Sequence, residues 1–295
     1  MPRPESMPDT MENPALTERK SYRVQFKGGL DYALAGIIDR PVQDRDIRAS
    51  VVFSHCFTCN KDLKAIVRIS RALSSLGIAV LRFDMTGLGG SDGDFSQTNF
   101  TTNLQDLRSA IHFAKTELGF VTGLIGHSFG GAATLALTAE YSLSSNLPDT
   151  DPKVAITLAA PSDTQHLAAL LERMNPEIET NGSGIVHIGG RPWRITREML
   201  ADFRVHDLPK LIGSIAKPTL LFHSPTDETV SYDHVLRIIG LIQNGGTNPY
   251  PPSLISLVGS DHLISNEPKT IDWIASSAAA FLQRFTNENQ VIHPA

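Results

Sequence analysis

Hydrophobic and polar positions alternate near the start of the chain and then give way to continuous apolar runs. Residues 22–26 and 32–38 alternate as half-buried strands do, and Gly28-Gly29 between them predicts an antiparallel hairpin. The later runs have the length and character of strands covered on both faces. They are predicted at 49–55, 77–83, 121–126, 154–160, 218–224 and 253–258.

Apolar residues recur at helical spacing between these runs. Helices are predicted over 62–76, 100–118, 129–141, 232–242 and 270–285. An antiparallel start followed by alternating strands and helices predicts the α/β class, with a mostly parallel, doubly wound sheet. Ligands of such sheets bind beyond the carboxyl ends of the strands, so residues directly after strands are the candidates for function.

The alternation is interrupted between 162 and 212. This stretch contains helical patterns at 165–174 and 197–203, and a hairpin pattern over 184–195 in which Gly189-Gly190 suits a tight turn. We interpret 162–212 as an inserted cap that divides the core into 21–161 and 213–286. Residues 1–20, rich in proline and charge, are expected to be a disordered leader, and 287–295 a polar tail.

Composition narrows the cellular setting and the partners. The chain has 295 residues and a net charge of −5 without a basic block, which argues against nucleic acid or an anionic membrane surface as partner. It has no apolar run of about 18 residues that would span a membrane. The start lacks the apolar region of a signal peptide, and two cysteines provide no disulfide framework. We therefore expect a cytoplasmic protein, and the sequence leaves its oligomeric state open.

The strongest motif lies where the strand at 121–126 meets the next helix. Gly126-His127-Ser128-Phe129-Gly130 has the G-x-S-x-G pattern of a nucleophile elbow in its strand–turn–helix context. Glycines two positions either side of the serine remove side chains that would collide with the neighbouring strand and helix. The pattern predicts that the hydroxyl of Ser128 stands exposed at the sheet edge, above a helix N-terminus that favours negative charge.

An acid and a histidine follow Ser128 along the chain, in the order that is typical of sequences with this elbow motif. Asp227 comes just after the strand at 218–224, and His262 just after the strand at 253–258. A serine hydroxyl needs a base, and the base needs an acceptor that fixes its tautomer. We predict a triad of Ser128 as nucleophile, His262 as base and Asp227 as the acid. Weaker candidates for the acid are Asp261, Glu228 and Asp233.

Two backbone N–H groups are expected to form the oxyanion hole. One belongs to Phe129, directly after the nucleophile, and the other is assigned to Phe57 in the loop after the strand at 49–55. In proteins with a nucleophile elbow, the corresponding loop commonly contains His-Gly, whereas here Cys56 stands in place of the glycine. Cys56 and Trp193, the latter in the predicted cap, are also candidates for the substrate pocket.

Cys56 and Cys59 form a C-x-x-C pair beside His55. Metal binding would lack a fourth ligand, and no thioredoxin-like pattern surrounds the pair. We favour a packed or pocket-lining thiol pair, and a reversible disulfide that modulates the loop is a further hypothesis. The glycine-rich loop at 83–91 lacks a phosphate-binding order, so Asp84 is expected to brace the neighbouring loops. No metal or cofactor is expected.

These motifs together resemble the α/β-hydrolase superfamily over residues 22–285. The resemblance rests on His55, Asp84-x-x-Gly87-x-Gly89-x-Ser91, Gly126-His-Ser128-Phe-Gly130, Asp227 and Gly259-x-x-His262. Residues 55–62 and 81–89 resemble, more closely, hydrolase domains that some bacterial proteins fuse to an osmotically inducible protein C-like domain. The resemblance implies the α/β-hydrolase fold and serine esterase chemistry without a cofactor.

The sequence therefore predicts a serine carboxylic ester hydrolase that works through an acyl-enzyme. Its expected partner is a small-molecule ester with a short to medium acyl chain. One alternative is an aminopeptidase-like enzyme, or another amide or thioester hydrolase with the same triad. For an aminopeptidase, the amine could be bound by Glu172, Glu177 or Glu179. The alternative from another class is a non-catalytic binding module with this fold.

Overall fold

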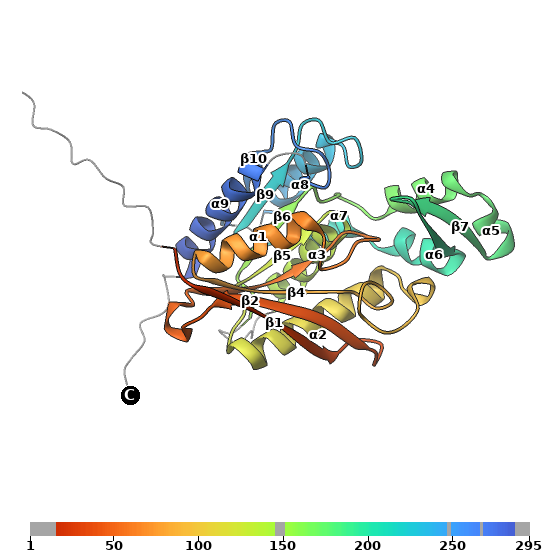
Figure 1. The fold of residues 1–295 in the computed structure, drawn as a ribbon. Helices are drawn as coiled ribbons and strands as arrows, with labels where there is room; N and C mark the ends of the chain where they lie inside the picture. The colour runs from red at the N-terminus through yellow and green to blue at the C-terminus, as the bar shows by residue number, and fades with distance from the viewer. Residues whose placement is uncertain (1–15, 145–150, 247–248, 266–267, 287–295) are drawn as a thin grey trace, which may run out of the picture.

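An eight-stranded sheet forms the centre of the protein in the computed structural model (Figure 1), which describes residues 16–144, 151–246, 249–265 and 268–286. The strand order is β1-β2-β4-β3-β5-β6-β9-β10, and β2 runs antiparallel to both of its neighbours while the remaining pairs are parallel. The predicted α/β-hydrolase architecture with an antiparallel N-terminal hairpin is confirmed. The strands are β1 (Arg19–Lys27), β2 (Ala33–Pro41), β3 (Ala49–Ser54), β4 (Ile78–Phe83), β5 (Gly123–His127), β6 (Val154–Leu158), β9 (Thr219–His223) and β10 (Ser253–Ser256).

The first strand begins inside the segment that we expected to be a leader. Arg19 already pairs with Pro41 of β2, and the backbone N–H of Thr17 donates to the carbonyl of Ser75 at 2.9 Å. These backbone bonds tie 17–20 to the sheet and to the end of α1, so the predicted boundary at residue 20 is too late. The rest of the predicted leader, 1–15, and the tail, 287–295, lie outside the described residues.

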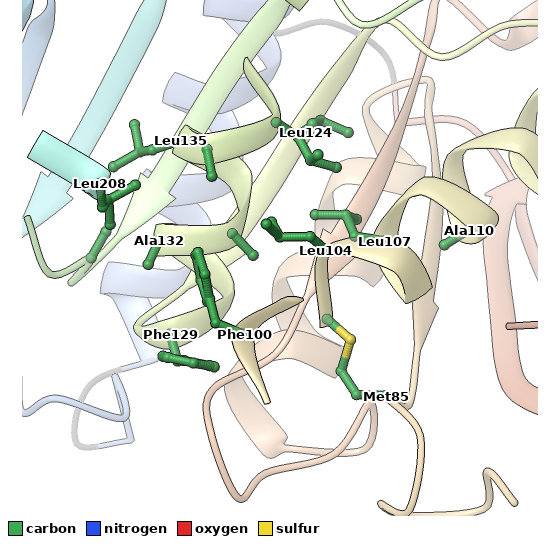
Figure 2. Packing of buried hydrophobic residues seen from close by; sticks show 14 of the residues in the cluster. Met85, Phe100, Leu104, Leu107, Ala110, Leu124, Phe129, Ala132, Leu135 and Leu208 are labelled. Carbon is green, nitrogen blue, oxygen red and sulfur yellow. The ribbon is translucent and has the colours of Figure 1, made fainter. Parts of the chain in front are cut away.

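Helices cover both faces of the sheet. Buried apolar residues of α1 and α9 pack on one face, and those of α2, α3, α7 and α8 pack on the other. The second face is seen in Figure 2, where Leu107 of α2, Leu124 of β5 and Leu135 of α3 are packed in one cluster. Each such side chain contributes about 1.5–3 kcal/mol when it is fully buried. The helices on the sheet are α1 (Lys64–Ser75), α2 (Phe100–Leu118), α3 (Phe129–Leu143), α7 (Leu208–Gly213), α8 (Tyr232–Asn244) and α9 (Pro268–Thr286), and the short 3-10 turns are η1 (Asp44–Asp46) and η2 (Phe95–Gln97).

The segment between β6 and α7 forms a separate group of elements at one end of the molecule (Figure 1). It consists of α4 (Gln165–Met174), α5 (Glu177–Asn181), the hairpin of β7 (Ser183–Ile188) and β8 (Arg191–Thr196), and α6 (Arg197–Val205). Gly189 and Gly190 have φ values of 59° and 75°, as the predicted tight hairpin turn requires. The helix α5 was expected to be a loop, and α7 was not predicted. Both are short, and their ends are set by local residues such as Pro176, Gly182 and Asp207.

This inserted segment packs against the N-terminal end of α3. The ring of Phe203 on α6 lies 5.1 Å from the ring of Phe129 on α3 and 5.8 Å from the ring of Phe57, measured between centroids. Within the segment, the Arg204 guanidinium pairs with Glu172 of α4 at 2.9 Å and with Glu179 of α5 at 2.6 Å. The aromatic contacts hold the segment over the carboxyl end of β5, and the ion pairs join α4, α5 and α6 within it. None of the described helices has the length and apolar character needed to cross a membrane.

Candidate active site

The turn between β5 and α3 has the backbone of a nucleophile elbow. Ser128 lies at φ 53° and ψ −119°, in the left-handed half of the φ range that non-glycine residues rarely adopt. A Cβ at Gly126 would lie 2.2 Å from the carbonyl oxygen of Gly130, and a Cβ at Gly130 would lie 2.4 Å from that of His55. The two glycines therefore permit the close approach that the sequence predicted, and the turn leaves Ser128 at the edge of the sheet.

Three predicted residues meet at this turn. The Nε2 of His262 lies 3.0 Å from the Oγ of Ser128, and the Nδ1 of His262 lies 2.7 Å from the Oδ2 of Asp227. Because the carboxylate can only accept, Nδ1 carries a proton, and Nε2 of the neutral ring is free to accept the serine proton. This arrangement can activate a hydroxyl as a nucleophile and store its proton on the imidazole. The alternative acid Asp261 instead accepts hydrogen bonds from Ser265.

The carboxylate of Asp227 is held ionised and correctly oriented by its own loop. Its Oδ1 accepts the backbone N–H groups of Thr229 and Val230 at 2.8 and 2.9 Å, while Oδ2 faces His262. Burial alone would raise the pKa of Asp227, but the hydrogen bonds from His262 and the backbone lower it below its ordinary value. The group therefore stays negative and can stabilise an imidazolium on His262.

Two further buried histidines fix the loops that carry these residues. His127 donates from Nε2 to the backbone carbonyl of His262 at 2.7 Å, and His223 donates from Nε2 to the carbonyl of Val230 at 2.8 Å. Burial, followed by the neighbouring His262, lowers the pKa of His127 to about 4, and burial also lowers the pKa of His223. Both rings are therefore neutral donors at pH 7. The sequence did not predict this role for either histidine, and His223 ends β9 four residues before Asp227.

The loop after β3 lies directly against the elbow. The close approach of Gly130 to the carbonyl oxygens of Ser54 and His55 shows this, as does the 5.3 Å separation of the Phe57 and Phe129 rings. Within the part of the chain that the structure describes, the backbone N–H of Phe57 has no hydrogen-bond acceptor. The N–H of Phe129 is in the first turn of α3, where intrahelical acceptors are lacking. Both predicted oxyanion donors thus lack an acceptor within the described part of the chain, and both residues line one cavity with Ser128.

Bonds from the flanking residues brace the same loop. His55 donates from Nδ1 to the Cys56 carbonyl at 2.7 Å and accepts the Met85 N–H at Nε2 at 3.1 Å. The carboxylate of Asp84 accepts the backbone N–H of Lys61 at 2.6 Å and that of Gly90 at 2.8 Å, and pairs with the Lys61 ammonium. Asp84 therefore connects the loop after β3 with the loop after β4, as predicted, and the glycine-rich segment at 83–91 has a structural role.

The cysteines depart from the prediction. Cys56 and Cys59 form a disulfide, whereas the sequence favoured a packed or pocket-lining thiol pair and gave a reversible disulfide as a further hypothesis. The cause is the turn at 56–59, in which the N–H of Cys59 donates to the Cys56 carbonyl at 3.2 Å. The turn brings the two Cα atoms to 5.2 Å, within the range that a disulfide spans. Among the described residues, no group of three His, Cys, Asp or Glu side chains is placed to hold a metal ion.

A cavity of about 370 Å³ opens beside Ser128 and His262 and extends under the inserted segment. Its apolar lining comes largely from α4, where Leu167, Leu170, Leu171 and Met174 point to one side. Their spacing of three, four and seven residues is a signal from which these lining residues could have been predicted. Cys56, Phe57 and Phe129 also line the cavity, and the role of Cys56 in binding a substrate stays a prediction.

Trp193 does not line this cavity, contrary to the prediction. Its ring packs edge-on against Phe95 of η2 at 4.8 Å between centroids, and its Nε1 donates to the carbonyl of Ile188. The reason is the register of the hairpin, which directs Trp193 toward η2, while Ile188 and Gly189 at the hairpin's tip reach the cavity. His166 and His187 of the inserted segment also line the cavity, although sequence analysis gave neither a role in the pocket.

The fold and the geometry of this site define a hydrolase, and comparison with known proteins agrees. A model of the Alpha/beta hydrolase family matches residues 51–289, and the chain belongs to this family. The esterase domain of a Rhodothermus marinus protein is 34% identical, with a TM-score of 0.67, over 90% of this chain and 98% of that one.

Two other solved structures share the fold at lower identity. Est1E from Butyrivibrio proteoclasticus, solved with bound ferulic acid, is 22% identical, with a TM-score of 0.72, over 88% of this chain and 98% of that one. An esterase from Pyrococcus furiosus is 17% identical, with a TM-score of 0.65, over 90% of this chain and 91% of that one. No curated protein matches the chain.

Proposed function

We propose that the protein is a serine carboxylic ester hydrolase that works through an acyl-enzyme. One observation carries the proposal: the Ser128 hydroxyl, His262 and Asp227 form a continuous hydrogen-bonded chain at the mouth of an apolar cavity. Such a chain is needed for nucleophilic attack by a hydroxyl, because a serine is a weak nucleophile without a base. The likeness to the Rhodothermus esterase domain supports the same chemistry.

In the proposed mechanism, the Oγ of Ser128 attacks the ester carbonyl while Nε2 of His262 takes its proton. The developing oxyanion accepts hydrogen bonds from the N–H groups of Phe57 and Phe129, beside the positive end of the α3 dipole. His262 then protonates the leaving alcohol. It next activates a water molecule, which releases the acid from Ser128, and Asp227 stabilises the imidazolium in both steps.

The cavity favours an uncharged acyl group of short to medium length. Among the described residues that line it, none is acidic and none is a lysine or arginine, and apolar side chains, including leucines, Met174 and phenylalanines, predominate. A charged acyl group would lose its hydration there and would find no lysine, arginine or carboxylate to form an ion pair with. We propose that the inserted segment acts as a cap and that its helix α4 provides the wall of the acyl site.

An aminopeptidase-like activity, the alternative from the sequence, has less support. Recognition of a substrate amine needs an unpaired carboxylate near the nucleophile. Glu172 and Glu179 instead pair with Arg204 at 2.9 and 2.6 Å, and no glutamate is among the described residues that line the cavity. We also propose that the chain is related to the hydrolase domains that some bacterial proteins fuse to an osmotically inducible protein C-like domain.

The test compares the parent with Ser128→Ala, using p-nitrophenyl butyrate turnover and labelling by a fluorophosphonate. Ser109→Ala on α2, which does not line the cavity, is the matched serine control. We expect the parent and Ser109→Ala to hydrolyse the ester and to be labelled, and Ser128→Ala to lose both properties while its circular dichroism is unchanged. Turnover retained in Ser128→Ala would overturn the assignment, and faster cleavage of aminoacyl nitroanilides than of esters would favour the amide hydrolase.

A further inference from the structure

The loop that carries the Phe57 donor is closed by the one disulfide that the chain can form. The chain has two cysteines, and the bond between Cys56 and Cys59 encloses Phe57 and Thr58 in a small ring. All four residues line the cavity beside Ser128. The N–H proposed to bind the oxyanion therefore belongs to the backbone that the disulfide constrains.

We propose that the Cys56–Cys59 disulfide positions the Phe57 N–H for catalysis and makes the rate of hydrolysis depend on its redox state. The inference rests on the proposed function, because it concerns the oxyanion donor of that reaction. Donors of an oxyanion hole are effective only when they are held in place before charge develops. A misplacement of about 1 Å in such a site can cost about 100-fold in rate.

The disulfide closes the turn that carries the Phe57 N–H. This N–H belongs to the same peptide group as the Cys56 carbonyl, which accepts hydrogen bonds from the ring of His55 and from the Cys59 N–H at the other end of the turn. On the C-terminal side of the turn, the Lys61 N–H is held by Asp84. The Phe57 side chain packs on Phe95, Phe129 and Phe203, which fixes its ring. Between Cys56 and Lys61, the disulfide is the covalent link that restricts rotation of the backbone at Phe57 and Thr58.

The disulfide can be reached through the opening that admits the substrate. Cys56 is 5% exposed, whereas Cys59 is only partly buried and lines the cavity. A thiolate of a small dithiol is therefore expected to attack the sulfur of Cys59, which breaks the Sγ–Sγ bond and releases the thiolate of Cys56. The second thiol of the reductant then displaces Cys59. Two electrons and two protons pass to the protein, and the reductant becomes a cyclic disulfide.

The experiment measures hydrolysis of p-nitrophenyl butyrate by the full chain before and after treatment with dithiothreitol, which is removed before the assay. Because the chain has two cysteines, titration with a thiol reagent should count none before reduction and two after it. We expect reduction to lower kcat about tenfold, part of the 100- to 1,000-fold that loss of an oxyanion donor costs, while KM changes less than about twofold. Reoxidation should restore kcat.

The double variant Cys56→Ser/Cys59→Ser is the matched control. Its kcat should equal that of the reduced parent and should not respond to dithiothreitol. A kcat that is unchanged in the parent with two titrated thiols would overturn the proposal, and so would an equal response of the double variant. Two thiols that are present in the untreated chain and resist a mild oxidant would also overturn it.

A second readout separates this inference from the proposed function. The rate at which a fluorophosphonate labels Ser128 depends on the same oxyanion donors, because the phosphoryl oxygen occupies the oxyanion position. We expect this rate to fall by a similar factor on reduction. A parent that is labelled but does not hydrolyse esters would count against ester hydrolysis alone, whereas equal labelling rates before and after reduction would refute the role of the disulfide.

Discussion

Replacing Gly130 by alanine tests how the loop after β3 depends on its contact with the elbow. Gly130 is the second residue of α3, and its Cβ would lie 2.4 Å from the carbonyl oxygen of His55 and 2.5 Å from that of Ser54. Both neighbours are backbone atoms, so no side-chain rotation relieves the collision. The loop or the helix must move by about 1 Å to reach the 3.3–3.6 Å of an ordinary C···O contact.

The size of the effect follows from that displacement. Overpacking of this kind typically costs about 1–3 kcal/mol of unfolding free energy. The same shift separates the Phe57 N–H from the Phe129 N–H, and misplacing a catalytic group by about 1 Å can cost about 100-fold in rate. We therefore expect Gly130→Ala to lower kcat by about 10- to 100-fold and to unfold at lower urea concentration than the parent.

Gly240→Ala provides the matched control for this change. Gly240 lies within α8, and a Cβ there would meet nothing within 4 Å. Alanine is favoured over glycine in a helix by about 1 kcal/mol, so this variant should be slightly more stable than the parent and equally active. Urea unfolding and p-nitrophenyl butyrate kinetics would be measured for all three proteins. A Gly130→Ala protein with the parent's kcat and stability would refute the close packing of the elbow on this loop.

Three further changes test other parts of the structure. Burial and the neighbouring His262 lower the pKa of His127 to about 4, so the unfolded chain binds more protons than the folded chain between pH 4 and about 6.5. Because of this group, the free energy of unfolding measured in urea should be about 2 kcal/mol lower at pH 5 than at pH 7. The variant His127→Gln should lose this part of the pH dependence. Arg82→Ala leaves the fully buried Asp39 carboxylate without its cation and should cost about 3–5 kcal/mol in the same assay, and a loss below about 1 kcal/mol would contradict a buried pair. Leu170→Trp fills part of the cavity and should lower kcat/KM for octanoate relative to butyrate esters, whereas an unchanged ratio would show that the acyl chain lies elsewhere.

Local patterns in the sequence predicted most of the sheet and the positions of the proposed catalytic residues. The first two strands have an alternating pattern and the others are short apolar runs, and each has its expected place within a few residues. Ser128, Asp227 and His262 could be predicted because each follows a strand, and parallel strands bring their carboxyl ends to one edge. The elbow was equally predictable from its motif, although only Gly126 is required by contacts within the strand–turn–helix unit, whereas Gly130 is required by the backbone of Ser54 and His55 at the end of β3.

Features that depend on contacts between distant segments were not predictable in the same way. Trp193 meets Phe95, which precedes it by almost a hundred residues, and no periodic pattern links the two. The disulfide depends on the path of a turn at 56–59, which the C-x-x-C spacing alone does not define. The short helices α5 and α7 contain too few residues for an apolar stripe, because one or two turns provide at most two buried positions.

The site is assembled from segments that lie far apart along the chain. The hydrogen bond between Ser128 and His262 joins residues 134 positions apart, and both β9 and β10 enter the sheet after the inserted segment. Closing so long a loop carries an entropic cost that must be met before the contact forms, and proteins dominated by such contacts fold slowly. During refolding, ester turnover should therefore return after the helical signal, which makes activity a reporter of the last strands to dock.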